Sequence, residues 1–242
     1  MIYGTRAVME AIHAGKEIEK VMIQSGLSND LIKELIQTAR DRQIPYTFVP
    51  AEKLKRLSTK NHQGVICLLS SVSYASLDNL IDRAYSAGRE PFLLILDRVT
   101  DVRNFGAIAR SAECAGIDGI VISEKGSAPI TSDAMKTSAG ALNYVPVCRE
   151  KDLKKTVKFL RDNGIRVIAC TEKAARQIYD TPLKGPVAMV MGSEEDGIDP
   201  SLLRDADELV KIPMNGKIGS LNVSVAAGIA LYEIVRNRSA QA

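Results

Sequence analysis

Three short segments carry residues that can do chemistry, and each follows an apolar run. The first comes after Phe92–Leu96 and holds Asn104, a residue type that suits a helix N-cap, and Arg110. Ile108 marks the buried face of the helix predicted here, and Arg110 points roughly 200° away from it at about 100° per residue. Arg110 therefore either faces a polar ligand or forms an ordinary surface ion pair with Glu113.

The second segment is an acidic loop, Gly192–Gly197, directly after the apolar run Val187–Met191. A glycine at position 192 allows a ligand to approach the backbone closely. The loop carries Glu194 among three consecutive acidic residues, which are tolerated more readily where a donor-rich ligand or a cation compensates them. The alternative is an ordinary strand-to-helix loop.

The third segment, Ile212–Ser224, again leads from an apolar run through a glycine-containing loop into a helix. Ser220 is a candidate N-cap for that helix. Its apolar face is lined with small residues, Ala226, Ala227 and Ala230, and can pack close to another backbone in the same chain or in a partner. A normal capped core helix is the alternative.

Along the chain, apolar runs that predict strands alternate with segments of helical periodicity. This alternation predicts an α/β fold with a doubly wound parallel sheet that would position the three segments. Ligands in such sheets bind beyond the carboxyl ends of the strands. The predicted strands are 21–24, 46–49, 64–69, 92–96, 119–122, 145–147, 166–170, 187–191 and 208–212. The predicted helices are 31–42, 51–57, 77–87, 105–115, 132–137, 152–163 and 221–236.

Composition and missing motifs exclude several classes of protein. The 242 residues are 45% hydrophobic and 25% charged, which is typical of a globular chain. No apolar run approaches the ~20 residues of a membrane span, and the N-terminus lacks a signal-peptide pattern, so we expect a cytoplasmic protein. Two histidines and four cysteines without a C-x-x-C pair predict no metal site. The fingerprints of dinucleotide-binding enzymes, P-loop NTPases and α/β-hydrolases are absent.

Net positive charge is confined to the N-terminal part of the chain. Residues 1–72 hold 10 Lys/Arg and 7 Asp/Glu, a net charge of +3, whereas the remaining residues hold 22 of each. The excess includes a cluster next to polar loop residues, which suits a phosphate backbone. An equally open alternative is a solvated helix face. The cluster comprises Lys53, Lys55, Arg56, Lys60 and the neighbouring His62.

Taken together, the three segments resemble the three motifs of the SpoU family of RNA ribose 2′-O-methyltransferases, within the SPOUT superfamily. The resemblance runs from about Pro91 to the C-terminus, and Ser-Leu-Asn-Val after Ile-Pro-Met is its most specific element. One departure is visible, because the family commonly has Asp-Pro where this chain has Asp101-Val102. The residues that carry the resemblance are Asn104, Gly106, Arg110, Gly192, Ser193, Glu194, Gly197, Ile212, Pro213, Met214, Ser220, Leu221 and Asn222.

The N-terminal segment is similar to the family's small, ribosomal-protein-like substrate-binding domain, through Tyr3–Val8 and His62–Val65. The resemblance thus implies an RNA substrate-binding domain over residues 1–72, a linker and helix over 73–89, and a SPOUT catalytic domain over 90–242 with a deep trefoil knot. RNA-binding residues would be Arg6, Lys53, Lys55, Arg56, Lys60 and His62.

Family membership would also imply S-adenosylmethionine as the methyl donor and a homodimer formed through the C-terminal domain. Backbone groups of the knot loops would hold the cofactor at Gly192, Ile212 and Leu221, with Thr171 and Met214 nearby. Arg110 would act on the ribose hydroxyl, assisted by Asn104, Glu194, Ser220 and Asn222. No metal or membrane is implied.

The substrate implied is a guanosine of large-subunit (23S) ribosomal RNA, because the N-terminal arrangement resembles that branch more closely than the transfer-RNA branch. A tRNA ribose 2′-O-methyltransferase and a non-catalytic ribosome-assembly factor of the same fold are the alternatives. An unrelated α/β metabolic enzyme is disfavoured by the missing nucleotide fingerprints.

Overall fold

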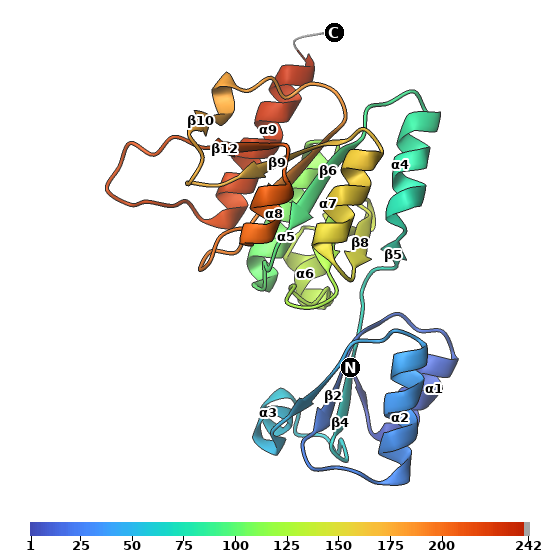
Figure 1. Cartoon of the computed structure of the whole chain (residues 1–242). Coiled ribbons are helices and arrows are strands. Elements are labelled where there is room, and N and C mark those ends of the chain that lie inside the picture. Colours follow the sequence, from blue (N-terminus) through green and yellow to red (C-terminus); the bar gives the residue numbers. More distant parts are fainter. Residues whose placement is uncertain (240–242) are drawn as a thin grey trace. The chain divides into compact units, whose positions relative to one another are not determined.

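A computed structural model of the chain describes residues 1–239, which form two compact units (Figure 1). The first unit comprises Met1–Ser73 with Pro129–Ser132, and the second comprises Tyr74–Ala128 with residues 133–239. Each unit contains its own sheet and its own hydrophobic core.

The first unit is a four-stranded sheet of order β1-β4-β2-β3 with helices on both faces. Side chains alternate along β2, so Val21 and Ile23 face α1 and α2, whereas Met22 faces α3. Only β2 and β3 pair in parallel; the other pairings are antiparallel. The elements are β1 (Ile2–Tyr3), α1 (Thr5–His13), β2 (Ile18–Gln24), α2 (Asp30–Asp41), β3 (Tyr46–Val49), α3 (Ala51–Leu57) and β4 (Val65–Leu69).

The second unit is an eight-stranded sheet of order β10-β12-β9-β11-β6-β7-β8-β5, in which every pairing is parallel. Its strands are β5 (Tyr74–Ala75), β6 (Phe92–Leu96), β7 (Gly119–Ser123), β8 (Val147–Glu150), β9 (Arg166–Cys170), β10 (Arg176–Gln177), β11 (Val187–Met191) and β12 (Glu208–Lys211). Its helices are α4 (Leu77–Ser86), α5 (Val102–Cys114), α6 (Ser132–Thr137), α7 (Leu153–Asp162), α8 (Pro200–Asp205) and α9 (Val223–Ser239).

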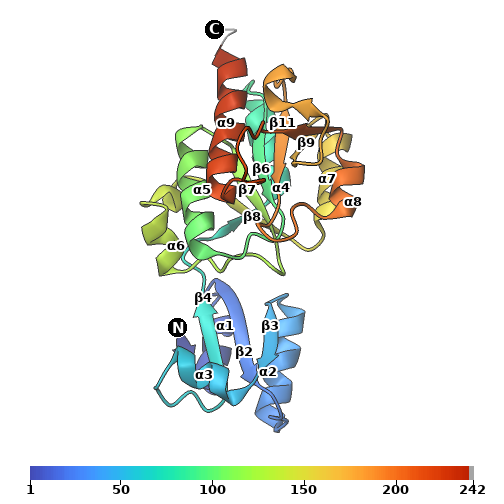
Figure 2. The same cartoon turned by 90° about the vertical axis from the view of Figure 1, so that its left-hand side faces the viewer.

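Helices cover both faces of this sheet (Figure 2), as parallel strands that are apolar on both sides require. Leu93 and Ile95 of β6 pack in one core with α4, α7 and α8. Helices α5 and α9 pack against each other on the opposite face. The predicted small-residue face of α9 is used there, because Ala227 and Ala230 are fully buried within the chain.

The α/β prediction is confirmed, and the strands at 46–49, 92–96, 166–170 and 187–191 match their predicted bounds. Helices α1 and α8 were not predicted, and neither were the two-residue strands β1, β5 and β10, which are too short to show a periodic pattern. Strand β8 begins at Val147, two residues after the predicted start at residue 145, and it runs to Glu150. The trefoil knot stays a prediction.

Strand order places the predicted segments at one edge. The order of the strands reverses at β6 and β11, which are parallel neighbours: β7 and β8 lie on one side of them, and β9 and β12 lie on the other. Doubly wound sheets bind ligands at such switch points. The loops after β6, β9, β11 and β12 all leave from this carboxyl edge because the strands are parallel. Among residues 1–239, no helix is long and apolar enough to cross a membrane.

Candidate active site

A cavity of about 460 Å³ opens at the carboxyl ends of β9, β11 and β12. Loops that are far apart in sequence form its walls, and Cys170 closes it at the end of β9. All five residues predicted to hold the cofactor line this one cavity, as do two of the predicted catalytic residues, Glu194 and Ser220. The five are Thr171, Gly192, Ile212, Met214 and Leu221.

The acidic loop after β11 folds back on itself directly behind Gly192. Ser193 and Gly197 exchange backbone hydrogen bonds of 3.1 Å in both directions. A Cβ atom at position 192 would lie 2.2 Å from the carbonyl carbon of Gly197. The sequence suggested that Gly192 lets a ligand approach the backbone. In the structure, the backbone of Gly197 and Ile198 fills the space that a side chain at position 192 would need.

Three predicted catalytic residues meet beside the cavity. The side-chain amide of Asn222 donates to Asn104 Oδ1 at 3.0 Å and to Glu194 Oε1 at 2.7 Å. The same Glu194 oxygen accepts from the backbone N–H of Val223 at 3.3 Å. One amide thus ties the loops after β6, β11 and β12 together, and it does so at the three positions that carry the motifs.

Helix capping differs from the prediction at both α5 and α9. Helix α5 begins at Val102 and is capped by Asp101, whose carboxylate accepts from the backbone N–H of Asn104 at 2.8 Å. The predicted cap Asn104 therefore lies in the first turn, where its side chain is free to meet Asn222. This capping bond restrains the turn at Asp101. In the family, a proline at the position of Val102 would restrict the same turn.

At α9 the predicted cap Ser220 is exposed in the preceding loop. Asn222 takes the capping role instead, because its Oδ1 accepts from the backbone N–H of Ser224 at 2.9 Å. The side chain of Asn222 is thus shared, with its oxygen on the helix end and its amide on Glu194 and Asn104.

A second cavity of about 420 Å³ adjoins the first on the side of β6. The two share a wall formed by the acidic loop, so Glu194 borders both. Asn104, Arg98 and Thr100 line only the second cavity. Two adjoining hollows with a carboxylate between them suit the transfer of a group from one bound molecule to another.

Arg110 lies apart from this cluster. It is exposed on α5 and lines neither cavity. Within the part of the chain that the structure describes, its side chain has no hydrogen-bond or ion-pair partner, so the surface pair with Glu113 is not formed. An unpaired guanidinium on a helix surface is available to an external ligand.

The predicted RNA-binding residues all belong to the first unit. Lys53, Lys55 and Arg56 are exposed on α3, which carries one acidic residue, Glu52. Lys60 lies over the ring of Tyr3, with Nζ 5.3 Å from the ring centroid.

The two other members of that predicted set lie on α1 and in the turn before β4. Arg6 is exposed on α1, and the ring nitrogen Nδ1 of His62 accepts from the backbone N–H of Gly64 at 3.0 Å. The turn at Gln63 lies beside Gly4, since a Cβ at position 4 would be 3.4 Å from the Gln63 amide oxygen.

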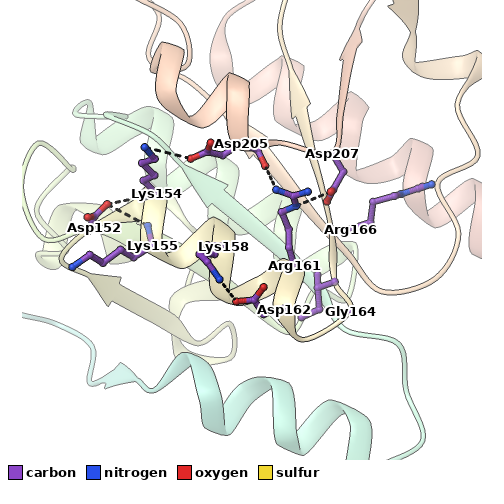
Figure 3. A pocket seen from close by; sticks show the side chains of 11 residues that line it. Asp152, Lys154, Lys155, Lys158, Arg161, Asp162, Gly164, Arg166, Asp205 and Asp207 are labelled. Carbon is purple, nitrogen blue, oxygen red and sulfur yellow. Dashed lines mark hydrogen bonds and ion pairs between the residues drawn. The ribbon is translucent and has the colours of Figure 1, made fainter.

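A larger hollow of the second unit lies elsewhere, against α7 and the start of β9, with a volume of about 1000 Å³. Six of its charged residues form ion pairs (Figure 3): Lys154–Asp205 at 3.9 Å, Lys158–Asp162 at 2.6 Å and Arg161–Asp207 at 2.7 Å. It lies away from the carboxyl edge of the sheet, so we assign the chemistry to the smaller pair of cavities. Among residues 1–239, no cluster of three His, Cys, Asp or Glu side chains is arranged to hold a metal ion.

Two site residues escaped the sequence analysis. Cys170 lines the first cavity, and burial raises the pKa of its thiol to about 11 although the backbone N–H of Ile212 opposes the rise. Arg98 lines the second cavity and contacts the acidic loop. Both stand at the end of a predicted apolar strand, within two residues of it, and that position was the available signal.

Comparison with known proteins agrees with this geometry. Residues 91–232 match the family described as SpoU rRNA Methylase, and residues 1–75 match the domain described as RNA 2′-O ribose methyltransferase substrate binding. A Bacillus subtilis (strain 168) relative, YacO, named as a TrmH-family tRNA/rRNA methyltransferase, is 34% identical over 238 residues, which cover 98% of this chain and 96% of the relative.

Two solved structures share the fold. The SpoU methyltransferase AviRb from Streptomyces viridochromogenes, crystallised with S-adenosylmethionine, superposes with a TM-score of 0.63 at 24% identity, covering 99% of this chain and 90% of that one. The A. aeolicus TrmH/SpoU tRNA modifying enzyme superposes with a TM-score of 0.59 at 26% identity, covering 68% of this chain and 85% of that one. The motifs, the cavity they enclose and these matches agree, and the chain belongs to the SpoU family of S-adenosylmethionine-dependent RNA methyltransferases.

Proposed function

We propose that the protein transfers a methyl group from S-adenosylmethionine to a ribose 2′-hydroxyl of RNA, and that its substrate is a guanosine of 23S ribosomal RNA in the cytoplasm. The substrate-binding description of residues 1–75 supports ribose 2′-O-methylation, and the rRNA Methylase description of residues 91–232 supports ribosomal RNA. The name of the YacO relative keeps transfer RNA as the second candidate substrate.

The observation that carries the proposal is the cluster of Asn104, Glu194 and Asn222 between two adjoining cavities. The first cavity fits S-adenosylmethionine in its chemistry, because it combines aliphatic side chains for an adenine ring with loop backbone and carboxylates for the positive groups. Ile198, Ile212 and Leu221 supply the apolar surface, and Glu194 and Glu195 supply the carboxylates.

When bound, the cofactor supplies an electrophilic methyl group. The chain's own contribution is to hold the ribose oxygen in line and stabilise its developing negative charge. Glu194 borders the cavity where the ribose would enter and can accept its hydroxyl proton. Asn104, Asn222 and Ser220 would orient the hydroxyl and the loops around it. A guanidinium stays protonated and is a poor base, so Arg110 would act as an electrostatic stabiliser of the alkoxide.

Because Arg110 lies outside both cavities of its own chain, a homodimer formed through the C-terminal domain would bring the guanidinium of one copy to the ribose bound by the other. The surface that α9 leaves exposed includes two large apolar side chains, Val225 and Tyr232, which are about half exposed at 50% and 51%. These residues are seven apart and share one face of the helix. Sedimentation as a monomer at micromolar concentration would contradict this dimer.

The first unit would bind the RNA. Lys53, Lys55 and Arg56 on α3 would contact phosphates, and Lys60 beside the Tyr3 ring would contact a neighbouring nucleotide. Arg6 and His62 would complete the RNA-binding set.

The test is single-turnover methyl transfer to 23S rRNA and to tRNA, combined with calorimetric titration of S-adenosylmethionine. We expect micromolar cofactor binding and ribose methylation of a 23S rRNA guanosine. RNA binding without cofactor binding would instead identify a non-catalytic ribosome-assembly factor, and methylation of tRNA alone would move the substrate to the second candidate.

Arg110→Ala should lower the methyl-transfer rate by roughly 10²–10³, by analogy with the loss of one oxyanion donor. Its free energy of unfolding should change by no more than ~0.5 kcal/mol, because the side chain is exposed and unpaired. Arg110→Lys should rescue poorly, since an ammonium lacks the planar fork of donors.

Mixed dimers test the proposed arrangement directly. Arg110→Ala chains mixed with Asn222→Ala chains should recover activity that neither variant has alone. A folded Arg110→Ala protein with a near wild-type rate would remove Arg110 from the mechanism.

A further inference from the structure

Arg98 has a backbone conformation that side chains rarely adopt. Its φ is +56°, in the left-handed region where glycine is favoured, and it lies two residues beyond the end of β6. Strained positions of this kind persist where the surrounding contacts over-determine them, and they gather at functional sites.

The guanidinium of Arg98 explains why an arginine stands there. It donates to both oxygens of Asp97, at 3.2 Å each, from Nε and Nη2. It also reaches across to the acidic loop, where Nη1 donates to Asp196 Oδ2 at 3.3 Å and Nη2 donates to the Gly197 carbonyl at 3.1 Å. A planar fork of donors is suited to such a bridge, and an ammonium is not.

Asp97, which accepts two of the hydrogen bonds from Arg98, is itself buried and held in place. Its side chain is 7% exposed, and Oδ2 accepts from the backbone N–H of Asp199 at 2.7 Å. Asp97 and Arg98 together therefore hold the acidic loop at Asp196 and Gly197 and the residue that follows it at Asp199.

The held loop is the one that carries Glu194. Both cavities share the loop as a wall, and Glu194 reaches from it to Asn222. A loop fixed at 196, 197 and 199 has little freedom two residues earlier, where the carboxylate must sit. Nothing in the contacts of Arg98 itself reaches Glu194, so its influence would pass through the loop.

We infer that Arg98 is a positioning residue for methyl transfer, which clamps the acidic loop so that Glu194 faces both cavities. The assignment rests on the proposed function, since it concerns the placement of Glu194 in that reaction. Arg98 would therefore govern kcat more than the KM for RNA, because the RNA is bound mainly by the first unit.

Arg98→Gly is the decisive variant, because glycine adopts a φ of +56° without strain while the clamp is lost. We expect a folded protein with a melting temperature below wild type, because the buried Asp97 carboxylate loses its guanidinium partner. Assayed well below that temperature, it should show a kcat lower by roughly 10- to 100-fold through misplacement of the reacting groups, and an unchanged KM for RNA. Arg98→Lys should recover only part of kcat. Hydrogen exchange at the backbone amides of residues 193–199 should be faster in Arg98→Gly than in wild type.

Gln43→Gly is the matched control. Gln43 has the same φ of +56°, is exposed, and lies in the first unit after α2, so this variant makes the same backbone change without touching the loop. It should keep kcat, KM and the exchange of residues 193–199 at wild-type values.

Unchanged exchange of residues 193–199 in Arg98→Gly would overturn the clamp, and faster exchange with unchanged kcat would overturn the positioning role. Failure of the proposed function would show differently, as a wild-type protein that methylates no RNA. In that case loop exchange and the Kd for S-adenosylmethionine would still decide whether Arg98 shapes the cavities.

Discussion

At the residue scale, the proposed chemistry depends on how the side chain of Asn222 is shared. Asn222 uses its carbonyl oxygen to cap α9 and its amide to hold Glu194 and Asn104. Removing either half of this arrangement has a different consequence, because the capping bond concerns stability and the amide bonds concern the position of the site residues.

Cys170 offers a direct probe of the first cavity. Its thiol, with a pKa raised to about 11 from the ordinary 9.0, carries roughly 100 times less thiolate than an ordinary thiol at pH values below about 9. Cys114 is exposed, whereas Cys67 and Cys148 are buried with pKa values raised to about 12 by burial. Iodoacetamide at pH 8 should therefore label Cys114 first and Cys170 much later.

We expect saturating S-adenosylmethionine to slow the labelling of Cys170 further, because that side chain lines the cavity that would hold the cofactor. Mass spectrometry of a Cys114→Ser variant, with and without cofactor and at pH 8 and pH 10, measures this. Labelling should rise between those pH values, since thiolate accumulates as pH approaches the raised pKa. Equal labelling with and without bound cofactor would place the cofactor elsewhere.

At the element scale, α5 and α9 carry the site on their first turns. Helix α5 is seated closely, because a Cβ at Gly106 would lie 2.6 Å from the Cβ of Thr137. Helix α9 lies against α5, and the bond between Asn222 and Asn104 joins their N-terminal ends.

Two substitutions at Asn222 should separate helix capping from catalysis. Asn222→Ala removes both, so we expect a loss of about 0.5–2 kcal/mol in stability together with a large loss of rate. Asn222→Ser keeps a good N-cap but lacks the amide donor to Glu194, so its stability should stay near wild type while its rate falls. Denaturant unfolding and single-turnover methyl transfer measure the two effects, and an active Asn222→Ser protein would leave the amide without a role.

At the scale of the whole molecule, the distribution of net charge indicates which part of the chain binds RNA. The net charge of +3 comes from residues 1–72, and the catalytic part is neutral. RNA affinity should therefore reside mainly in the first unit and fall with rising salt, at ~0.9 log unit per log unit of salt for each duplex-like phosphate contact.

Neutralising α3 tests that division in the full-length chain. The triple variant Lys53→Gln, Lys55→Gln, Arg56→Gln should weaken RNA binding and flatten its salt dependence, with the Kd for S-adenosylmethionine unchanged. Lys33→Gln, Arg40→Gln, Arg42→Gln removes the same charge from α2 and its end, and it should weaken RNA binding much less. Equal losses would mean that overall charge, and not the α3 surface, attracts the RNA.

The sequence by itself determined the elements whose signal is local. A run such as Phe92–Leu96 is apolar at every position and bounded by polar residues, so its burial in a parallel sheet follows from its composition. The motif loops can likewise be recognised because each directly follows such an apolar run. Parallel strands end at one edge of the sheet, so all five predicted cofactor positions line one cavity.

Tertiary structure decided what local signals leave open. Asp101 and Asn104 are both good capping residues three positions apart, and only the partner Asn222, 118 residues later, settles which one caps and which one joins the site. In the sequence, Arg98 is an ordinary charged residue. Only the fold brings Asp196 of the acidic loop, 98 residues later in the chain, into contact with its guanidinium. Strands of two residues form for the same reason, because pairing with a neighbour, and not their own composition, fixes them.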